Sequence, residues 1–153
     1  MGNTYSQIYI QVVFAVRNRD AMIMDEWASR LYDYITAIVQ NKHQKMLAIN
    51  GMPDHLHFFI GMQPDCCLSE LVREIKKNTN DFINDNKLTR SRFYWQDGFG
   101  AFSYSRSHID NVVKYIKNQK EHHLRQNFKD EYLEFLRKFS IEYNEKFLFD
   151  WIQ

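Results

Sequence analysis

Cysteine is scarce in this chain and occurs only as the adjacent pair Cys66 and Cys67 among 153 residues. Neighbouring cysteines suit neither an ordinary disulfide nor the C-x-x-C spacing of redox and zinc sites. The sequence therefore argues against a disulfide-stapled or zinc-ribbon protein, and it favours two unpaired thiols at the start of a helix.

Long apolar runs are also missing. No stretch approaches the ~18 apolar residues that a transmembrane helix needs, and the amino terminus lacks the basic, apolar and small-residue parts of a secretory signal. We therefore expect a cytoplasmic protein with no membrane partner. A chain of this length, with 44% hydrophobic residues, is enough for one packed domain and too short for two, so we expect residues 1–153 to form a single domain.

A large excess of charge is absent too, because the formal net charge is only +1. The charges are nevertheless unevenly distributed. Residues 71–127 hold 11 Lys and Arg against 6 Asp and Glu, whereas the segments on either side are each slightly acidic. This basic middle is compatible with a nucleic-acid partner, although such runs are usually solvated faces.

The spacing of apolar residues predicts alternating strands and helices, since strands repeat every two residues and helices every three to four. Strand, helix, strand, strand, helix, strand is the order of the ferredoxin-like, split β-α-β fold. We expect an α+β fold with an antiparallel sheet, helices on one face and extra carboxy-terminal helices. The predicted elements are a strand at 7–16, a helix at 26–41, a hairpin of 46–49 and 56–60, helices at 68–82 and 109–116 with an aromatic strand at 93–104 between them, and an acidic helical extension from about 128 that lies away from any chemistry.

Two histidines stand on the second strand of the predicted hairpin. Because side chains alternate along a strand, His55 and His57 project from one face while Leu56 faces the core. Two imidazoles on one face can chelate a divalent metal, but a pair of ordinary hydrogen-bonded histidines is at least as common. The His-x-His pattern is therefore a weak signal by itself.

The third predicted helix carries Tyr115 and Gln119 one turn apart on the same face. Such a tyrosine usually has its hydroxyl in water. It could instead be a nucleophile, because a phenolate attacks a phosphodiester when a metal polarises the phosphoryl oxygens, and Gln119 could add an amide oxygen to the metal site. Two imidazoles and an amide oxygen admit Mg²⁺, Mn²⁺ and related ions, and the lack of thiolates disfavours structural zinc.

These motifs resemble those of the single-tyrosine HUH transposases of small insertion sequences, where U is a hydrophobic residue. Residues 53–58 (PDHLHF) resemble the family's histidine motif, and residues 115–119 (YIKNQ) resemble its Tyr-x-x-x-Gln helix motif. Residues 95–102 (WQDGFGAF) are similar to the aromatic strand that precedes this helix. Two motifs in the right order are far more specific than either alone.

The resemblance implies a metal-dependent DNA transposase that cleaves and rejoins single-stranded DNA at hairpins near the ends of its element. It implies that Tyr115 is the nucleophile of a 5′-phosphotyrosine intermediate and that His55, His57 and Gln119 bind Mg²⁺ or Mn²⁺. Family members typically act as homodimers, in which the tyrosine helix of one protomer can complete the histidine site of the other. Tyr115 would then act in trans.

Basic residues near the motifs are expected to contact DNA, because phosphate neutralisation provides much of the affinity for nucleic acid. Phe99, Phe102 and Tyr104 are candidates for stacking on unpaired bases, with ordinary strand core at least as good an interpretation. His122 and His123 could assist proton transfer or bind phosphate, but they fit solvated helix-end residues better. The expected phosphate contacts are Arg73, Lys76 and Lys77, followed by Arg17, Arg19 and Arg106.

Three other functions fit part of the pattern. A histidine-triad nucleotide hydrolase also alternates histidines on a strand, but it needs a third histidine where Phe59 stands. A non-catalytic nucleic-acid-binding module could stack bases on a ferredoxin-like sheet, but it would not need Tyr115 and Gln119 together with a histidine pair. A domesticated transposase could keep the same site as a repeat-processing nuclease.

Overall fold

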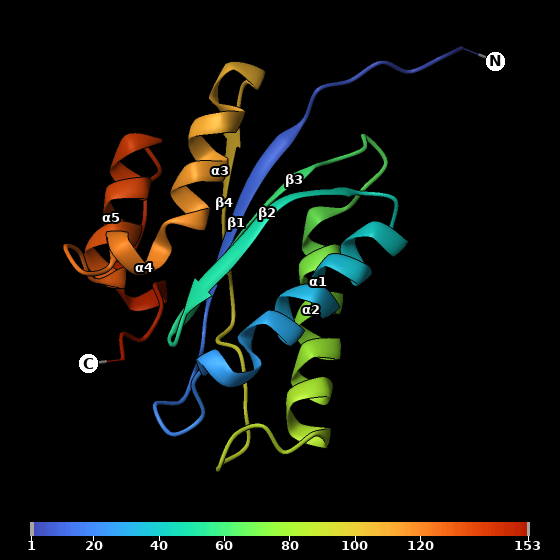
Figure 1. Cartoon of the computed structure of the whole chain (residues 1–153). Coiled ribbons are helices and arrows are strands. Elements are labelled where there is room, and N and C mark those ends of the chain that lie inside the picture. The colour runs from blue at the N-terminus through green and yellow to red at the C-terminus, as the bar shows by residue number, and fades with distance from the viewer. Residues whose placement is uncertain (1, 153) are drawn as a thin grey trace.

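The computed structural model describes residues 2–152 as a four-stranded antiparallel sheet with helices around it (Figure 1). The strand order is β2-β3-β1-β4, which confirms the predicted ferredoxin-like topology. No helix in this part of the chain is long and apolar enough to cross a membrane. The strands are β1 (Tyr9–Ala15), β2 (Lys45–Met52), β3 (His55–Gly61) and β4 (Gly100–Tyr104), and the helices are α1 (Asp25–Asn41), α2 (Leu68–Asp85), α3 (Ile109–Lys117), α4 (Gln119–His122) and α5 (Phe128–Lys138), with 3-10 turns at Arg106–His108 and Glu145–Phe147.

The two central strands form the middle of the core. β1 pairs with both β3 and β4, and its last five residues are all buried. Its β-branched and aromatic side chains suit a strand that is covered on both faces. The predicted hairpin is also confirmed, because β2 pairs with β3 and only Pro53 and Asp54 connect them.

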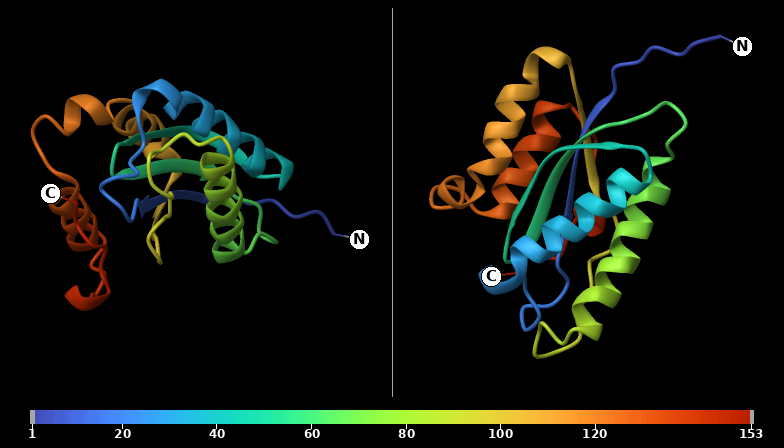
Figure 2. Two further views of the ribbon diagram at one scale, coloured as in Figure 1. Left: turned by 90° about the horizontal axis from the view of Figure 1, so that it is seen from below. Right: turned by 45° about the vertical axis from the view of Figure 1, so that its right-hand side comes forward.

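Helices cover the two faces of the sheet in separate groups (Figures 1 and 2). On one face, Phe58 of β3 meets Phe14 of β1 edge-on, and Lys76 of α2 places its ammonium 5.2 Å from the Phe14 ring centroid. On the other face, Phe59 packs against Ile116 of α3. The histidine pair alternates with Phe58 and therefore lies on the α3 side.

The aromatic segment before α3 differs from the prediction of a strand over residues 93–104. β4 begins only at Gly100, and a single isolated bridge between Trp95 and Val16 precedes it. Gly98 has a φ of 83°, in the left-handed region that interrupts an extended strand. The segment bends at this glycine, so only its last five residues join the sheet.

Helix α5 docks on β4 through aromatic side chains. The rings of Phe102 and Phe135 stack with centroids 5.0 Å apart. Beside them, a Cβ atom at Gly100 would lie 2.7 Å from the Tyr132 hydroxyl oxygen and 2.8 Å from a carbon of its ring. The absence of a side chain at Gly100 therefore lets α5 approach the sheet.

Replacing Gly100 by alanine should lower the free energy of unfolding by about 1–3 kcal/mol, because the new methyl group overlaps the buried Tyr132 ring. Urea unfolding followed by circular dichroism measures this, and we expect one transition for a single domain. The matched control is Gly61→Ala, whose Cβ would meet nothing nearer than 3.7 Å. Equal stability of the two variants would contradict the close docking of α5.

Candidate metal and nucleophile site

The histidine pair is fully buried on β3. His55 Nδ1 lies 2.7 Å from Asp54 Oδ1, and His57 Nδ1 lies 3.0 Å from the side-chain amide of Gln11. With these partners at Nδ1, both rings turn Nε2 toward the interior of the site. A carboxylate at Nδ1, as Asp54 provides for His55, is an arrangement that orients a metal-binding imidazole.

Helices α3 and α4 bring the other two predicted residues to the histidines. Asn50 of β2 donates from its side chain to the last two carbonyl groups of α3, at 3.0 and 3.1 Å, where α3 ends. Gln119 then begins α4, and its buried Oε1 lies 3.3 Å from His55 Nε2. The rings of Tyr115 and His57 have centroids 6.1 Å apart. All four predicted residues therefore meet within one chain.

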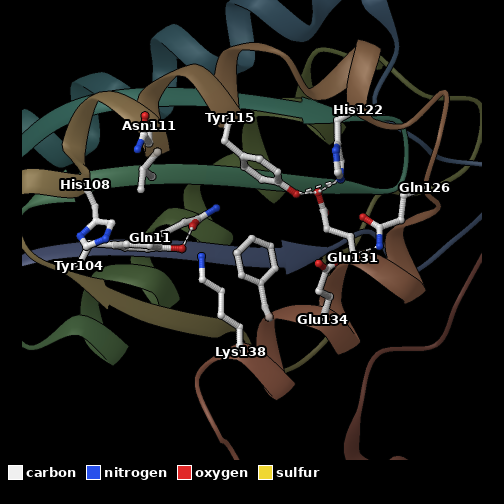
Figure 3. A pocket seen from close by; sticks show the side chains of 12 residues that line it. Gln11, Tyr104, His108, Asn111, Tyr115, His122, Gln126, Glu131, Glu134 and Lys138 are labelled. Carbon is white, nitrogen blue, oxygen red and sulfur yellow. Dashed lines mark hydrogen bonds and ion pairs between the residues drawn. The ribbon is translucent and has the colours of Figure 1, made fainter.

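Glu131 of α5 lies among these side chains, as the close-up of the neighbouring pocket shows for Tyr115 and His122 (Figure 3). Its Oε1 is 2.9 Å from His57 Nε2 and 3.5 Å from His55 Nε2, while its Oε2 accepts a hydrogen bond from the Tyr115 hydroxyl. The expectation that the helical extension lies away from the chemistry was therefore wrong, because α5 folds back onto the sheet and contributes a residue to the site.

The two histidines of the α4 segment also belong to the site, although the sequence favoured solvated helix-end residues. His123 Nε2 lies 3.0 Å from Gln119 Oε1 and 3.3 Å from Glu131 Oε2. His122 Nε2 lies 3.1 Å from the Tyr115 hydroxyl oxygen. The single turn of α4 carries both rings back toward the carboxylate instead of into solvent.

One feature of the sequence could have identified Glu131. The buried face of α5 comprises Phe128, Glu131, Tyr132, Phe135 and Leu136, so a carboxylate interrupts an otherwise apolar stripe. Acidic residues are almost never fully buried unless they are paired, and this position therefore indicates a partner inside the protein. Phe128 of the same stripe stacks on the His55 ring at a centroid distance of 3.9 Å.

The titratable groups of the site perturb one another. Burial raises the pKa of Glu131, but the surrounding histidines, His57 foremost, outweigh burial and bring this pKa well below its usual range. Burial and the Glu131 charge raise the pKa of Tyr115, and burial lowers the pKa of His57. Burial also lowers the pKa of His55, but hydrogen bonds to Asp54 and Glu131 more than offset it and raise the pKa to about 8. The carboxylate is therefore ionised and Tyr115 is a protonated hydrogen-bond donor.

A pocket of about 310 Å³ gives access to Tyr115 between α3 and α5 (Figure 3). Its lining includes Glu131 and Tyr104, whose hydroxyl donates to Gln11 Oε1 at 3.0 Å. Tyr104 is therefore placed to meet a ligand. Phe102, in contrast, is only 2% exposed under α5, so it belongs to the core and cannot stack on a base.

The sequence model of a family described as IS200-like transposases matches residues 4–119. The chain belongs to the IS200-like transposase family. The recognition made from the histidine and tyrosine motifs is thereby confirmed, and this chain is a DNA transposase. Helix α5 and its Glu131 lie beyond the matched residues.

Two solved structures share the fold of this transposase. A candidate transposase from Deinococcus radiodurans R1 is 22% identical with a TM-score of 0.60, over 78% of this chain and 96% of that one. A REP-associated tyrosine transposase bound to a REP hairpin is 20% identical with a TM-score of 0.59, over 80% of this chain and 73% of that one. No curated protein matches the chain.

The side chains at the centre of the transposase site could hold a divalent metal. One donor atom from each of His55, His57, His123 and Glu131 lies within 4.8 Å of the others. Imidazole nitrogens with carboxylate and amide oxygens suit Mn²⁺ and related divalent ions, and they also admit Mg²⁺. The chemistry of the donor set therefore fits the predicted cofactor.

The predicted phosphate contacts of the transposase do not come together. Arg73 and Lys77 are exposed on α2, on the side of the sheet opposite the histidines. The Lys76 ammonium donates to the carbonyls of Gln96 at 2.8 Å and Gly98 at 2.6 Å, and burial lowers the pKa of Lys76 to about 8. Contact with DNA stays a prediction for all six residues. The other three are exposed, Arg17 and Arg19 after β1 and Arg106 before α3.

Replacing Asp54 by asparagine should lower the pKa of His55 in the metal-free transposase, because a neutral amide no longer favours the imidazolium. The folded-state pKa of about 8 exceeds the ordinary 6.5, so His55 contributes stability that is complete below pH 6.5 and is lost as pH rises through 8. This pH dependence should flatten in the variant. Nuclear magnetic resonance titration of the His55 ring measures the pKa, with Asp33→Asn on the exposed face of α1 as the control. A His55 pKa that is the same in both variants would contradict this role of Asp54.

Proposed function

We propose that this transposase is a metal-dependent single-strand endonuclease and strand transferase with Tyr115 as its nucleophile. His55, His57 and Gln119 would hold Mg²⁺ or Mn²⁺. The strongest support is that the Tyr115 hydroxyl and the Nε2 atoms of both histidines face the same Glu131 carboxylate. A nucleophile beside a metal site is the arrangement that phosphoryl transfer requires.

The proposed substrate is single-stranded DNA that folds into hairpins at the ends of the element. The REP-associated transposase that shares this fold was solved with a REP hairpin. Exposed arginines and lysines on both sides of the sheet would contact phosphates away from the cleavage point. These proposed contacts are Arg17, Arg19, Arg73, Lys77 and Arg106, together with the remaining N–H group of Lys76.

In the proposed reaction, the Tyr115 hydroxyl oxygen attacks the scissile phosphorus and the bond from phosphorus to the 3′ oxygen breaks. The 5′ end of one strand is then linked to Tyr115, and the other strand ends in a 3′ hydroxyl. The proton that leaves Tyr115 balances the one that the 3′ oxygen gains, and His122 is close enough to take part in this transfer. When bound, the metal would neutralise charge at the phosphoryl oxygens.

Two of the rival functions have less support. A histidine-triad hydrolase would need a metal-free histidine cluster on β3, but Phe59 is fully buried against α3. A base-stacking module would need an open sheet face, whereas helices lie over both faces in residues 2–152 (Figure 2). A domesticated repeat-processing nuclease would share the proposed chemistry, and hairpins flanking the gene would distinguish it from a mobile element.

The homodimer with shared active sites stays a prediction from the family resemblance. A single chain already places Tyr115 beside its own histidine pair. In a site shared between protomers, Tyr115 would have to leave Glu131 of its own chain and approach the histidine pair of the partner subunit. A reaction within one chain needs no such movement.

Incubation with labelled single-stranded DNA from hairpins that flank the gene, with Mn²⁺, should give a covalent protein-DNA adduct on a denaturing gel. Chelation of the metal should abolish the adduct. Tyr115→Phe should lower the rate of adduct formation by about a thousandfold or more. Tyr143→Phe changes an exposed tyrosine after α5 and should keep full activity. Adduct formation by Tyr115→Phe would exclude this nucleophile.

Mixing Tyr115→Phe protein with His57→Ala protein tests whether the site is shared. A reaction in trans should restore adduct formation in mixed dimers, up to about a quarter of the wild-type level if protomers assort at random. A reaction in cis should restore nothing, because every chain lacks either its nucleophile or its metal site. Subunit exchange must be shown separately with two differently labelled proteins.

A further inference from the structure

Glu131 is the only fully buried carboxylate in residues 2–152, and its side chain is 2% exposed. An ionised carboxylate that leaves water loses several kcal/mol of solvation unless charges or donors replace it. The proposed ligands His55, His57 and Gln119 are all neutral when they bind a metal. A divalent ion held by them alone would enter a buried site without a compensating negative charge.

The two oxygens of Glu131 face different groups. Oε1 faces the β3 histidines, at 2.9 Å from His57 Nε2 and 3.5 Å from His55 Nε2. Oε2 accepts from the Tyr115 hydroxyl and lies 3.4 Å from the Gln119 amide nitrogen. One carboxylate therefore connects the proposed metal ligands to the proposed nucleophile.

Three distances between the donor atoms match the spacing of ligands around a single ion. In an octahedral shell with bonds of about 2.1 Å, neighbouring ligand atoms lie about 3 Å apart, and in a tetrahedral shell about 3.4 Å apart. His57 Nε2 to Glu131 Oε1 is 2.9 Å, His55 Nε2 to the same oxygen is 3.5 Å, and His55 Nε2 to Gln119 Oε1 is 3.3 Å. Glu131 Oε1 thus stands where a ligand oxygen would stand.

We infer that Glu131 is a fourth protein ligand of the divalent metal, bound through Oε1 beside His55, His57 and Gln119, and that its Oε2 holds the Tyr115 hydroxyl. This inference rests on the metal site of the proposed function and adds to it a ligand from α5. The carboxylate supplies the negative charge that the three neutral ligands lack. It also fixes the distance between the nucleophile and the metal.

The test measures binding of Mn²⁺ alone by isothermal titration calorimetry and electron paramagnetic resonance, without DNA. Glu131→Gln keeps the size and shape of the side chain and one acceptor oxygen while it removes the charge, so it should fold. We expect its affinity for Mn²⁺ to fall at least about tenfold, since loss of even an outer-shell partner costs about 10–100-fold. An affinity within twofold of the wild type would overturn the inference.

Two controls separate a ligand from a structural residue. Glu134→Gln removes an exposed carboxylate one turn further along α5 and should leave Mn²⁺ affinity unchanged. Tyr115→Phe removes only the hydroxyl that Glu131 holds and should also keep the affinity. If Glu131→Gln and Glu134→Gln lose the same amount of Mn²⁺ affinity, the loss reflects only the change in net charge, and Glu131 is not a metal ligand.

The DNA assay is read separately, so the two proposals can fail independently. A wild-type protein that binds Mn²⁺ through Glu131 but forms no adduct would contradict the proposed reaction and keep the ligand. If instead the wild-type protein forms the adduct and Glu131→Gln binds Mn²⁺ as tightly as the wild type, the proposed reaction stands and the Glu131 ligand is rejected.

Discussion

A buried carboxylate needs partners, and the partners of Glu131 come from almost every part of the site. β3 supplies two imidazoles, α3 supplies the Tyr115 hydroxyl, and the α4 segment supplies Gln119 and His123. Removing the charged partner from a buried ion pair leaves the other charge without compensation, which typically costs about 3–5 kcal/mol. The same carboxylate therefore constrains the relative positions of three helices and the central sheet.

The sheet makes this convergence possible because β3 is covered on both sides. Alternation turns Phe58 toward Phe14 and the first two helices, and it turns the histidine pair and Phe59 toward α3. Asn50 on the neighbouring strand ends α3 and allows Gln119 to turn inward. On the other side of the site, Gly100 leaves room for α5 to bring in the carboxylate.

The side chains of the site come from within and from beyond the segment that matches the family. The histidine strand and the tyrosine helix lie within residues 4–119, which match the IS200-like transposases. The carboxylate lies outside that segment, on a helix that closes over the same face of the sheet (Figure 3). In this transposase, the docking of α5 places a carboxylate against both the histidine strand and the tyrosine helix. Side chains held in advance by such contacts lose little freedom when substrate binds.

The sequence by itself determined what depends on local periodicity. A two-residue repeat places His55 and His57 on one face of a strand, a four-residue step joins Tyr115 to Gln119, and the order of elements fixes the ferredoxin-like topology. Tertiary structure alone decided the contact between His57 and Glu131, which are separated by 74 residues. It also decided that the α4 histidines point inward and that Lys76 is held by backbone carbonyls. Local spacing cannot reveal these contacts, because they depend on how α5 and α2 pack onto opposite faces of the sheet.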